Sequence, residues 1–188
     1  MKRIYFLFLC LLTCLMLPLK GHAVSQAELL NSNRFQHIDS SVDSGRGDGK
    51  YLDLESIRTI ADSNGHRRIE ATLYVLMPAS NLIQGIQIEY DYQLNQSLRH
   101  LINAHEKALK QGAHTPYISI WRAKDENSGI TGMVKAAGAF TNDGSVRASL
   151  QQANIEAMML PAIFGIERYT LPNLIYQKVY GLAYDDEP

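Results

Sequence analysis

Alternation of apolar and polar positions is the clearest pattern in the middle of this chain. In residues 86–93 the apolar side chains are Ile86, Ile88, Tyr90 and Tyr92, and every residue between them is polar. A period of two places these four side chains on one face of a strand and leaves the other face in water. The pattern therefore predicts a strand that covers a core on one side only.

A hairpin is predicted before this strand. Residues 51–54 alternate, and residues 68–77 are apolar on both faces, as in a central strand. Asn64 and Gly65 lie between the two segments, and this pair favours a tight turn because both residues accept positive φ. Pro78 should end the second strand, since proline cannot donate a hydrogen bond to the ladder.

The remaining segments have weaker patterns. Residues 94–110 follow helical spacing, with Ser97 placed to cap the helix and Gly112 placed to end it, and a strand through residues 98–104 is the alternative. We also expect a strand over residues 117–123, a small Gly/Ala-rich hairpin arm between turns at 125–129 and 142–144, a helix over 149–164 and a strand over 174–184.

These segments predict an α+β fold with a mainly antiparallel β-sheet and one or two packed helices, because strands dominate and no regular βαβ alternation occurs. Residues 50–188 show no repeat and no interior linker, so a single domain is expected. Residues 24–49 are polar and end in a stretch rich in Gly, Ser and Asp, which predicts a leader or loop. Within it, Leu29, Leu30 and Phe35 could form one short helical turn on the domain.

The first 23 residues have the organisation of a secretory signal peptide. Lys2 and Arg3 form a positive head, residues 4–17 are almost wholly apolar, and small residues precede a cleavage point after Ala23, or alternatively after Ala27. An uncleaved anchor is disfavoured because this run is shorter than the about 20 apolar residues that span a membrane. We therefore expect an exported protein, periplasmic or extracellular, without a stable membrane span after cleavage.

Removal of this segment changes the composition. The 188 residues include 18 basic and 19 acidic side chains, for a net charge of −1. Residues 1–23 hold three basic residues, no acidic residue and both cysteines, so the mature chain has a net charge of −4 and no cysteine. Disulfides, thiol catalysis and cysteine-bound metal are therefore excluded there. Nucleic-acid binding is disfavoured, since Arg67 and Arg68 form an isolated basic pair.

A glycine-rich loop at residues 45–50 holds the candidate binding residues Arg46, Gly47 and Asp48. They spell the tripeptide that integrin receptors recognise, and a polar loop of an exported chain suits that interaction. A phosphate-binding loop is excluded by the glycine spacing and by Tyr51, which replaces the required Ser or Thr. A calcium loop would need alternating oxygen ligands and a closing glutamate. No cofactor is predicted.

Asp91, His100 and His105 are the candidate catalytic residues under an alternative hypothesis, an exported hydrolase. Carboxylate and imidazole groups can act as general acids and bases. However, no Gly-x-Ser-x-Gly elbow is present, and the polar face of a half-buried strand accounts for Asp91. His100 and His105 are separated by about 140° around a helix, so they would not bind one metal ion together. No metal site is predicted.

Residues 50–100 resemble the opening of the surface-adhesin protein E-like domains. The resemblance is carried by residues 51–57 (Tyr-Leu-Asp-Leu-Glu-Ser-Ile), by the turn and strand that follow, and by residues 89–92 (Glu-Tyr-Asp-Tyr) with residues 97–99 after them. It implies a sheet-rich, non-enzymatic surface or periplasmic domain that binds host matrix proteins. Family members commonly carry a cysteine where Tyr92 stands here, and residues 105–188 exceed what that module needs.

The sequence thus favours an exported, non-catalytic domain that binds an unidentified protein partner of the envelope or host surface, or another ligand. Contacts are expected from the loop at residues 46–48 and from exposed aromatic side chains, which make good binding surface. Four aromatic side chains are expected in the core, because each lies in an apolar strand pattern: Tyr74, Tyr90, Tyr92 and Trp121. Besides the hydrolase, the alternative is a structural component of an envelope complex, with residues 171–182 at a subunit contact.

Overall fold

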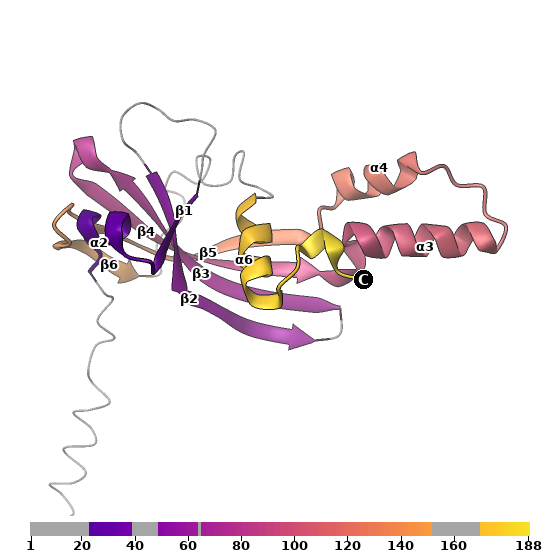
Figure 1. Ribbon diagram of the computed structural model, residues 1–188, viewed down its shortest axis with the longest axis horizontal. Helices are drawn as coiled ribbons and strands as arrows, with labels where there is room; N and C mark the ends of the chain where they lie inside the picture. Colours follow the sequence, from indigo (N-terminus) through magenta and orange to yellow (C-terminus); the bar gives the residue numbers. More distant parts are fainter. Residues whose placement is uncertain (1–22, 39–48, 64, 152–169) are drawn as a thin grey trace, which may run out of the picture.

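The computed structural model describes residues 23–38, 49–63, 65–151 and 170–188. Its centre is a six-stranded sheet in which each strand pairs antiparallel with the next one along the chain (Figure 1). The predicted α+β fold class with a mainly antiparallel sheet is confirmed. The strands are β1 (Phe35–Ile38), β2 (Gly49–Ser63), β3 (His66–Met77), β4 (Leu82–Gln93), β5 (Ile130–Phe140) and β6 (Val146–Gln151). The helices are α2 (Gln26–Asn31), α3 (Leu98–Lys110), α4 (Ile118–Glu126) and α6 (Thr170–Tyr180), with short 3-10 turns η1 (Pro78–Ser80), η2 (Leu94–Gln96) and η5 (Tyr184–Asp186).

The predicted hairpin between β2 and β3 is confirmed. Ser63 pairs with His66 at the end of the ladder. Gly65 has a φ of +95°, a conformation that a side chain would disfavour. β3 ends where η1 begins at Pro78, as expected.

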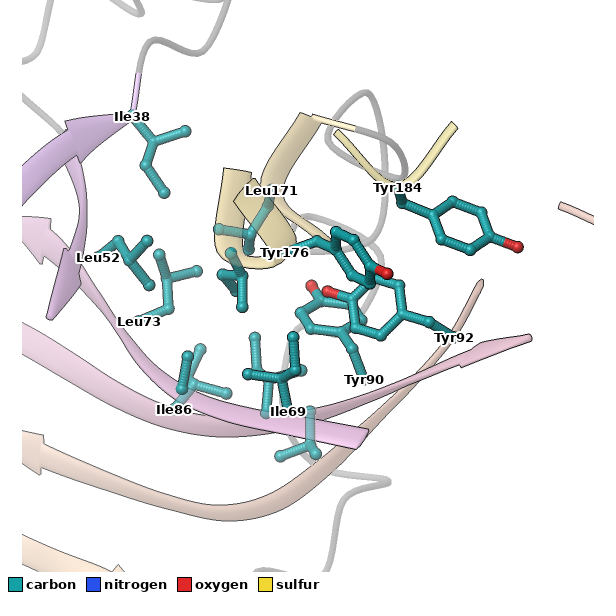
Figure 2. Close-up of a cluster of buried hydrophobic side chains, with 14 residues drawn as sticks. Ile38, Leu52, Ile69, Leu73, Ile86, Tyr90, Tyr92, Leu171, Tyr176 and Tyr184 are labelled. Carbon is teal, nitrogen blue, oxygen red and sulfur yellow. The ribbon is translucent and has the colours of Figure 1, made fainter. Parts of the chain in front are cut away.

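The larger core lies between one face of the sheet and α6, and Figure 2 shows several of its side chains. The alternation predicted for residues 86–93 is confirmed, since all four of its apolar side chains are buried here. Tyr92 donates a hydrogen bond from its hydroxyl to the carbonyl oxygen of Pro172 at 2.8 Å, which joins the sheet to α6. The buried members are Ile38, Leu52, Ile69, Ala71, Leu73, Ile86, Ile88, Tyr90, Tyr92, Val134, Leu171, Ile175, Tyr176 and Tyr184.

A smaller core lies on the opposite face of the sheet, because successive strand residues point to opposite sides. Its strand residues alternate with those of the larger core, and α2 covers them. Tyr74 is its central aromatic side chain, with the ring of Phe35 at 5.7 Å and that of Phe140 at 6.3 Å. The members are Val24, Leu29, Phe35, Tyr51, Tyr74, Leu76, Ile83 and Phe140.

The expectation that residues 24–49 are an irregular leader or loop is wrong for the part that the structure describes. The short helical turn expected at Leu29 and Leu30 is present as α2, residues 26–31, with Leu29 buried. Phe35, expected in the same turn, instead begins β1, residues 35–38, which pairs with residues 50–53 of β2. Arg34 also donates to both carboxylate oxygens of Asp53, at 2.8 and 2.5 Å. A short helix and a four-residue edge strand give little periodic signal, and packing against the sheet orders them. The division into signal peptide, leader and one domain otherwise stays a prediction.

Three further segments test the expected elements. The helix at residues 94–110 is confirmed as α3, with the Ser97 hydroxyl accepting from the amide of His100 at 3.1 Å. The strands expected over residues 117–123 and 174–184 are wrong, since these segments form α4 and most of α6. Short apolar runs fit a buried strand and a helix equally well, so the spacing of their apolar residues could not distinguish a strand from a helix.

The Gly/Ala-rich arm is confirmed as β5. The helix expected over residues 149–164 is wrong at its start, where residues 149–151 belong to β6. Its remainder, from residue 152, lies outside the described residues.

Candidate functional site

Helices α3 and α4 form a hairpin, residues 98–126, that projects from the end of the sheet (Figure 1). α3 leads away from the sheet, and α4 returns beside it to β5. Gly112 follows α3 with a φ of +90°, which lets the chain turn. The Ser119 hydroxyl donates to the carbonyl oxygen of Pro116 at 2.8 Å in the first turn of α4. Residues 105–122, here named the hairpin tip, comprise the second half of α3, the connection and the start of α4, and none of them belongs to either core. α4 lies beside the half of α3 that is nearer the sheet (Figure 1).

The base of the hairpin is fixed by a buried lysine. Lys124 is only 6% exposed, and its ammonium group donates to the carbonyl oxygens of Gln96 and Ser128 at 2.8 and 2.9 Å. It also lies 2.5 Å from the Asp185 carboxylate and 4.6 Å from the centre of the Tyr184 ring. A buried ammonium group with all these partners is stable in one position, so α4 is held firmly to the C-terminal segment.

The C-terminal segment also fixes the start of α3. The carboxylate of Asp185 accepts from the amide of Leu98 at 3.2 Å, in the first turn of the helix. The Ser97 hydroxyl donates to the carbonyl oxygen of Glu187 at 2.6 Å. Tyr184 is fully buried and donates to the carbonyl oxygen of Gln93 at 2.6 Å. The start of α3 and the end of α4 are therefore both anchored to the C-terminal segment.

The hairpin tip exposes apolar side chains. Tyr117, Ile118 and Trp121 are 54, 53 and 54% exposed, and Leu109 is 38% exposed. These four are half of the large apolar side chains that are exposed in the described part of the chain. Ile118 and Trp121 are three residues apart, so they share one face of α4. A cluster of this kind on a projecting element is typical of an interaction site.

His105 joins the two helices at the tip. Its side chain is buried, and its ring lies 4.6 Å from the ring of Tyr117, centre to centre. Leu109 follows four residues later on the same face of α3, so Leu109 and Tyr117 belong to one surface. The Nε2 atom of His105 has no hydrogen-bond partner among the described residues. His105 therefore serves here as a packing residue beneath an exposed tyrosine.

The charges of the tip are mainly positive. Lys107, Lys110 and Arg122 are exposed there, and Glu106 is the one acidic residue between positions 105 and 122. Residues 24–188 as a whole have a net charge of −4. The tip is thus a locally basic and apolar surface on an acidic protein.

The expectation that Trp121 lies in the core is wrong. In α4 the inward positions are taken by Ile120 and Lys124, which are four residues apart and both buried. Trp121 consequently faces outward. In the sequence, the helical spacing of Ile120 and Lys124 competed with an alternating pattern over residues 117–123, and the alternating pattern led to the wrong prediction for Trp121.

The three candidate catalytic residues have separate surroundings. Asp91 lies on β4 and its carboxylate is 3.1 Å from Nδ1 of His66, with both side chains largely exposed. His100 is exposed in the first turn of α3, and His105 packs against Tyr117. In the parts of the chain that the structure describes, Asp91 pairs with His66, and neither His100 nor His105 is hydrogen-bonded to it.

Two neighbouring carboxylates on the polar part of the sheet are held by cations. Glu70 and Glu89 are opposite each other on β3 and β4. Glu70 accepts from Arg58 Nε at 2.6 Å and from Gln87 Nε2 at 2.5 Å. Glu89 lies 3.5 Å from Arg68 and 3.5 Å from Lys135. These pairs offset the repulsion between two cross-strand acids, which is a structural role.

A cavity of about 340 Å³ lies between β2 and α6, lined by Leu54, Ile57, Thr59, Lys178 and Val179. Its lining includes no carboxylate and no histidine.

The candidate binding residues Arg46, Gly47 and Asp48 lie outside the described residues, as do residues 1–22 of the predicted signal peptide. Within the described ranges, no three His, Cys, Asp or Glu side chains gather as metal ligands would. Nor is any helix in those ranges long and apolar enough to cross a membrane.

Comparison of the chain with protein-family models, with curated proteins and with solved structures finds no match.

Proposed function

We propose that this protein is an exported, non-catalytic binding domain whose recognition surface is the hairpin tip. The observation that carries the proposal is the exposure of Tyr117, Ile118 and Trp121 together on the first turns of α4. Tryptophan and tyrosine supply large, stiff contact areas and are enriched among the residues that dominate binding energy. Export is inferred from residues 1–23.

The support beneath the tip suits this role. Lys124, Asp185 and Tyr184 hold the base of the hairpin through hydrogen bonds and an ion pair. A surface that is ordered before binding loses less conformational entropy when it meets a partner. The separate surroundings of Asp91, His100 and His105 favour binding over hydrolysis as the function of this chain.

The test compares two double variants of the protein recovered from the cells that export it. Ile118→Ser with Trp121→Ser removes apolar surface from the tip, and Met133→Ser with Val146→Ser removes exposed apolar surface from β5 and β6. Binding to washed envelope vesicles is measured by cosedimentation over a range of vesicle concentrations. The tip variant should bind at least about tenfold more weakly than wild type, because residues of this kind dominate interfaces. The strand variant should bind as wild type does.

Equal binding by the wild type and the tip variant would reject the hairpin tip as the recognition surface. Circular dichroism and the midpoint of thermal unfolding serve as controls for folding. All four substituted side chains are more than half exposed, so each double variant should keep the wild-type fold.

A further inference from the structure

We infer that the partner of the hairpin tip is a membrane surface that contains anionic phospholipid. This inference rests on the proposed function, since it names the partner of the same surface. It follows from three features of the tip: its apolar and aromatic side chains, its basic charge and its projecting shape.

The side chains of the tip are those that enter the boundary between headgroups and acyl chains. Tryptophan and tyrosine combine an apolar body with a polar edge, and they concentrate at membrane–water interfaces. At the tip, Trp121 and Tyr117 are accompanied by the aliphatic Ile118 and Leu109, all exposed. A short amphipathic segment of this composition lies in the plane of the interface with its apolar side buried by about 5–10 Å.

The charge of the tip is complementary to an anionic surface. Lys107, Lys110 and Arg122 are exposed on the hairpin tip, where Glu106 is the one acidic residue; Asp125 and Glu126 follow in the next turn of α4. Each such cation adds attraction to an anionic leaflet, and the attraction falls off within a Debye length. Since the mature chain has a net charge of −4, such a surface would repel most of the molecule and orient the tip toward itself.

The shape of the tip favours a lipid surface over a protein. A stable protein–protein interface uses about 20 to 30 residues on each side and a complementary surface. The hairpin instead offers four large exposed apolar side chains, with Leu109 near its far end and Trp121 one helical turn from Lys124 at its base. A lipid surface accommodates such a group without a preformed pocket, so the small contact area is sufficient when cations add to it.

Trp121 is the only tryptophan of the chain, so its fluorescence reports on the tip alone. The protein recovered after export is titrated with vesicles of phosphatidylcholine and, separately, with vesicles of phosphatidylcholine and phosphatidylglycerol in equal parts. With the anionic vesicles, the emission maximum of Trp121 should shift to shorter wavelength as the indole leaves water. The shift should reverse when salt is added, and phosphatidylcholine alone should give little change.

A pair of charge variants tests the role of the cations. Lys107→Gln with Lys110→Gln keeps Trp121 and should weaken binding to the anionic vesicles about 30-fold, since each cation contributes a factor of about five. Arg147→Gln with Lys178→Gln removes two exposed cations from β6 and α6, so it changes the net charge equally. This control should bind within about twofold of wild type, because its cations lie away from the tip.

Other outcomes separate this inference from the proposed function. If the protein binds envelope vesicles through the tip but no lipid vesicles, and protease treatment of the envelopes abolishes binding, the partner is a protein and the lipid inference is wrong. A shift of Trp121 emission with protein concentration alone, accompanied by dimers in sedimentation velocity, would overturn it in favour of a second copy. Equal weakening by both pairs of charge variants would also overturn it. Binding to neither envelopes nor vesicles would reject the proposed function itself.

Discussion

Arg67 and Glu187 form an ion pair that joins the beginning of β3 to the end of the chain, with Arg67 Nη1 2.8 Å from Glu187 Oε1. Tyr176 of α6 donates its hydroxyl to the other carboxylate oxygen of Glu187 at 2.9 Å. The guanidinium group of Arg67 also lies over the ring of Tyr180 at 4.0 Å. The pKa of the Tyr176 hydroxyl is raised by burial and by its bond to Glu187. This cluster closes the larger core at the C-terminus.

Replacement of Glu187 by Gln should lower the free energy of unfolding by about 2–3 kcal/mol, because a mostly buried guanidinium group loses the nearer of its two carboxylate partners and keeps only Asp62, at 3.4 Å. Asp186→Asn is the matched control, since Asp186 is the exposed neighbour. It should change stability by less than about 0.5 kcal/mol. Urea unfolding monitored by circular dichroism measures both. Equal values for the two variants would contradict a structural role for the pair.

Gly129→Ala should be among the most destabilising single changes in the described chain. Gly129 has a φ of +73°, and a Cβ atom there would lie 2.0 Å from the Tyr184 hydroxyl. Since Tyr184 is fully buried, it cannot move without loosening the base of the hairpin. The expected loss is more than about 3 kcal/mol.

Gly112→Ala is the control for the backbone effect of this change. Gly112 has a φ of +90°, but nothing lies within 4 Å of its Cβ position. Gly112→Ala should lower the free energy of unfolding by about 1 kcal/mol, from backbone strain alone. Similar thermal unfolding midpoints for the two glycine variants would show that the contact with Tyr184 is unimportant.

Ser56→Ala should lower the free energy of unfolding by about 1–3 kcal/mol, although it removes only one oxygen atom. The β2–β3 register jumps from the pair Asp53–Thr72 to the pair Arg58–Glu70, so β2 bulges between them. The Ser56 hydroxyl accepts from the amide of Thr72 at 2.7 Å and donates to the carbonyl oxygen of Asp53 at 2.7 Å. It thereby replaces a ladder bond that the bulge removes.

Ser63→Ala offers a comparison on the same strand. The Ser63 side chain is exposed and makes a long bond of 3.4 Å to the carbonyl oxygen of His66. Its loss should leave the unfolding midpoint nearly unchanged. Hydrogen exchange at the Thr72 amide should quicken in Ser56→Ala and not in Ser63→Ala; unchanged exchange in both would disprove the proposed bridge.

Stability should decline in alkali, in part because of Tyr74. Burial, and then the negative charge of Asp53, raise the pKa of Tyr74 from 10.0 to about 12. A hydroxyl whose pKa is higher in the folded state favours folding below the unfolded value, and this contribution is lost as the pH rises through the folded value. Tyr74 should therefore contribute up to about 3 kcal/mol that disappears between about pH 10 and pH 12.

Tyr74→Phe tests this titration. Urea unfolding at a series of pH values from neutral to strongly alkaline should show a shallower decline in the variant than in wild type. Some decline should persist, because burial also raises the pKa of Tyr92. A decline of equal steepness in both proteins would show that Tyr74 titrates as in the unfolded chain.

The local pattern alone was sufficient for the hairpin of β2 and β3, for β4 and for α3. Strict alternation in residues 86–93, an Asn-Gly turn and a Ser cap each act through near neighbours, so the chain encodes them locally. The same reasoning failed at residues 117–123 and 174–184, where a short apolar run is compatible with either period.

The exposed surface of the tip was only partly predictable. Exposed aromatic side chains were expected to bind, but Trp121 was placed in the core. Trp121 faces outward because Lys124, on another face of α4, is buried. The ammonium group of Lys124 contacts Gln96, Ser128 and Asp185. Gln96 and Asp185 come from distant parts of the chain, and no local pattern reveals them.

Hydrophobic period, turn residues and caps are short-range properties, so the strands β2 to β5 and the first helix of the hairpin could be predicted from the amino-acid sequence, and export stays a prediction from it. That the last residues of the chain close a core and fix a projecting hairpin became evident from the packed fold alone. The packed fold also decided which aromatic side chains remain in water. Burial and ion pairing depend on the three-dimensional neighbours of a side chain, and these are brought together only when the sheet and helices pack.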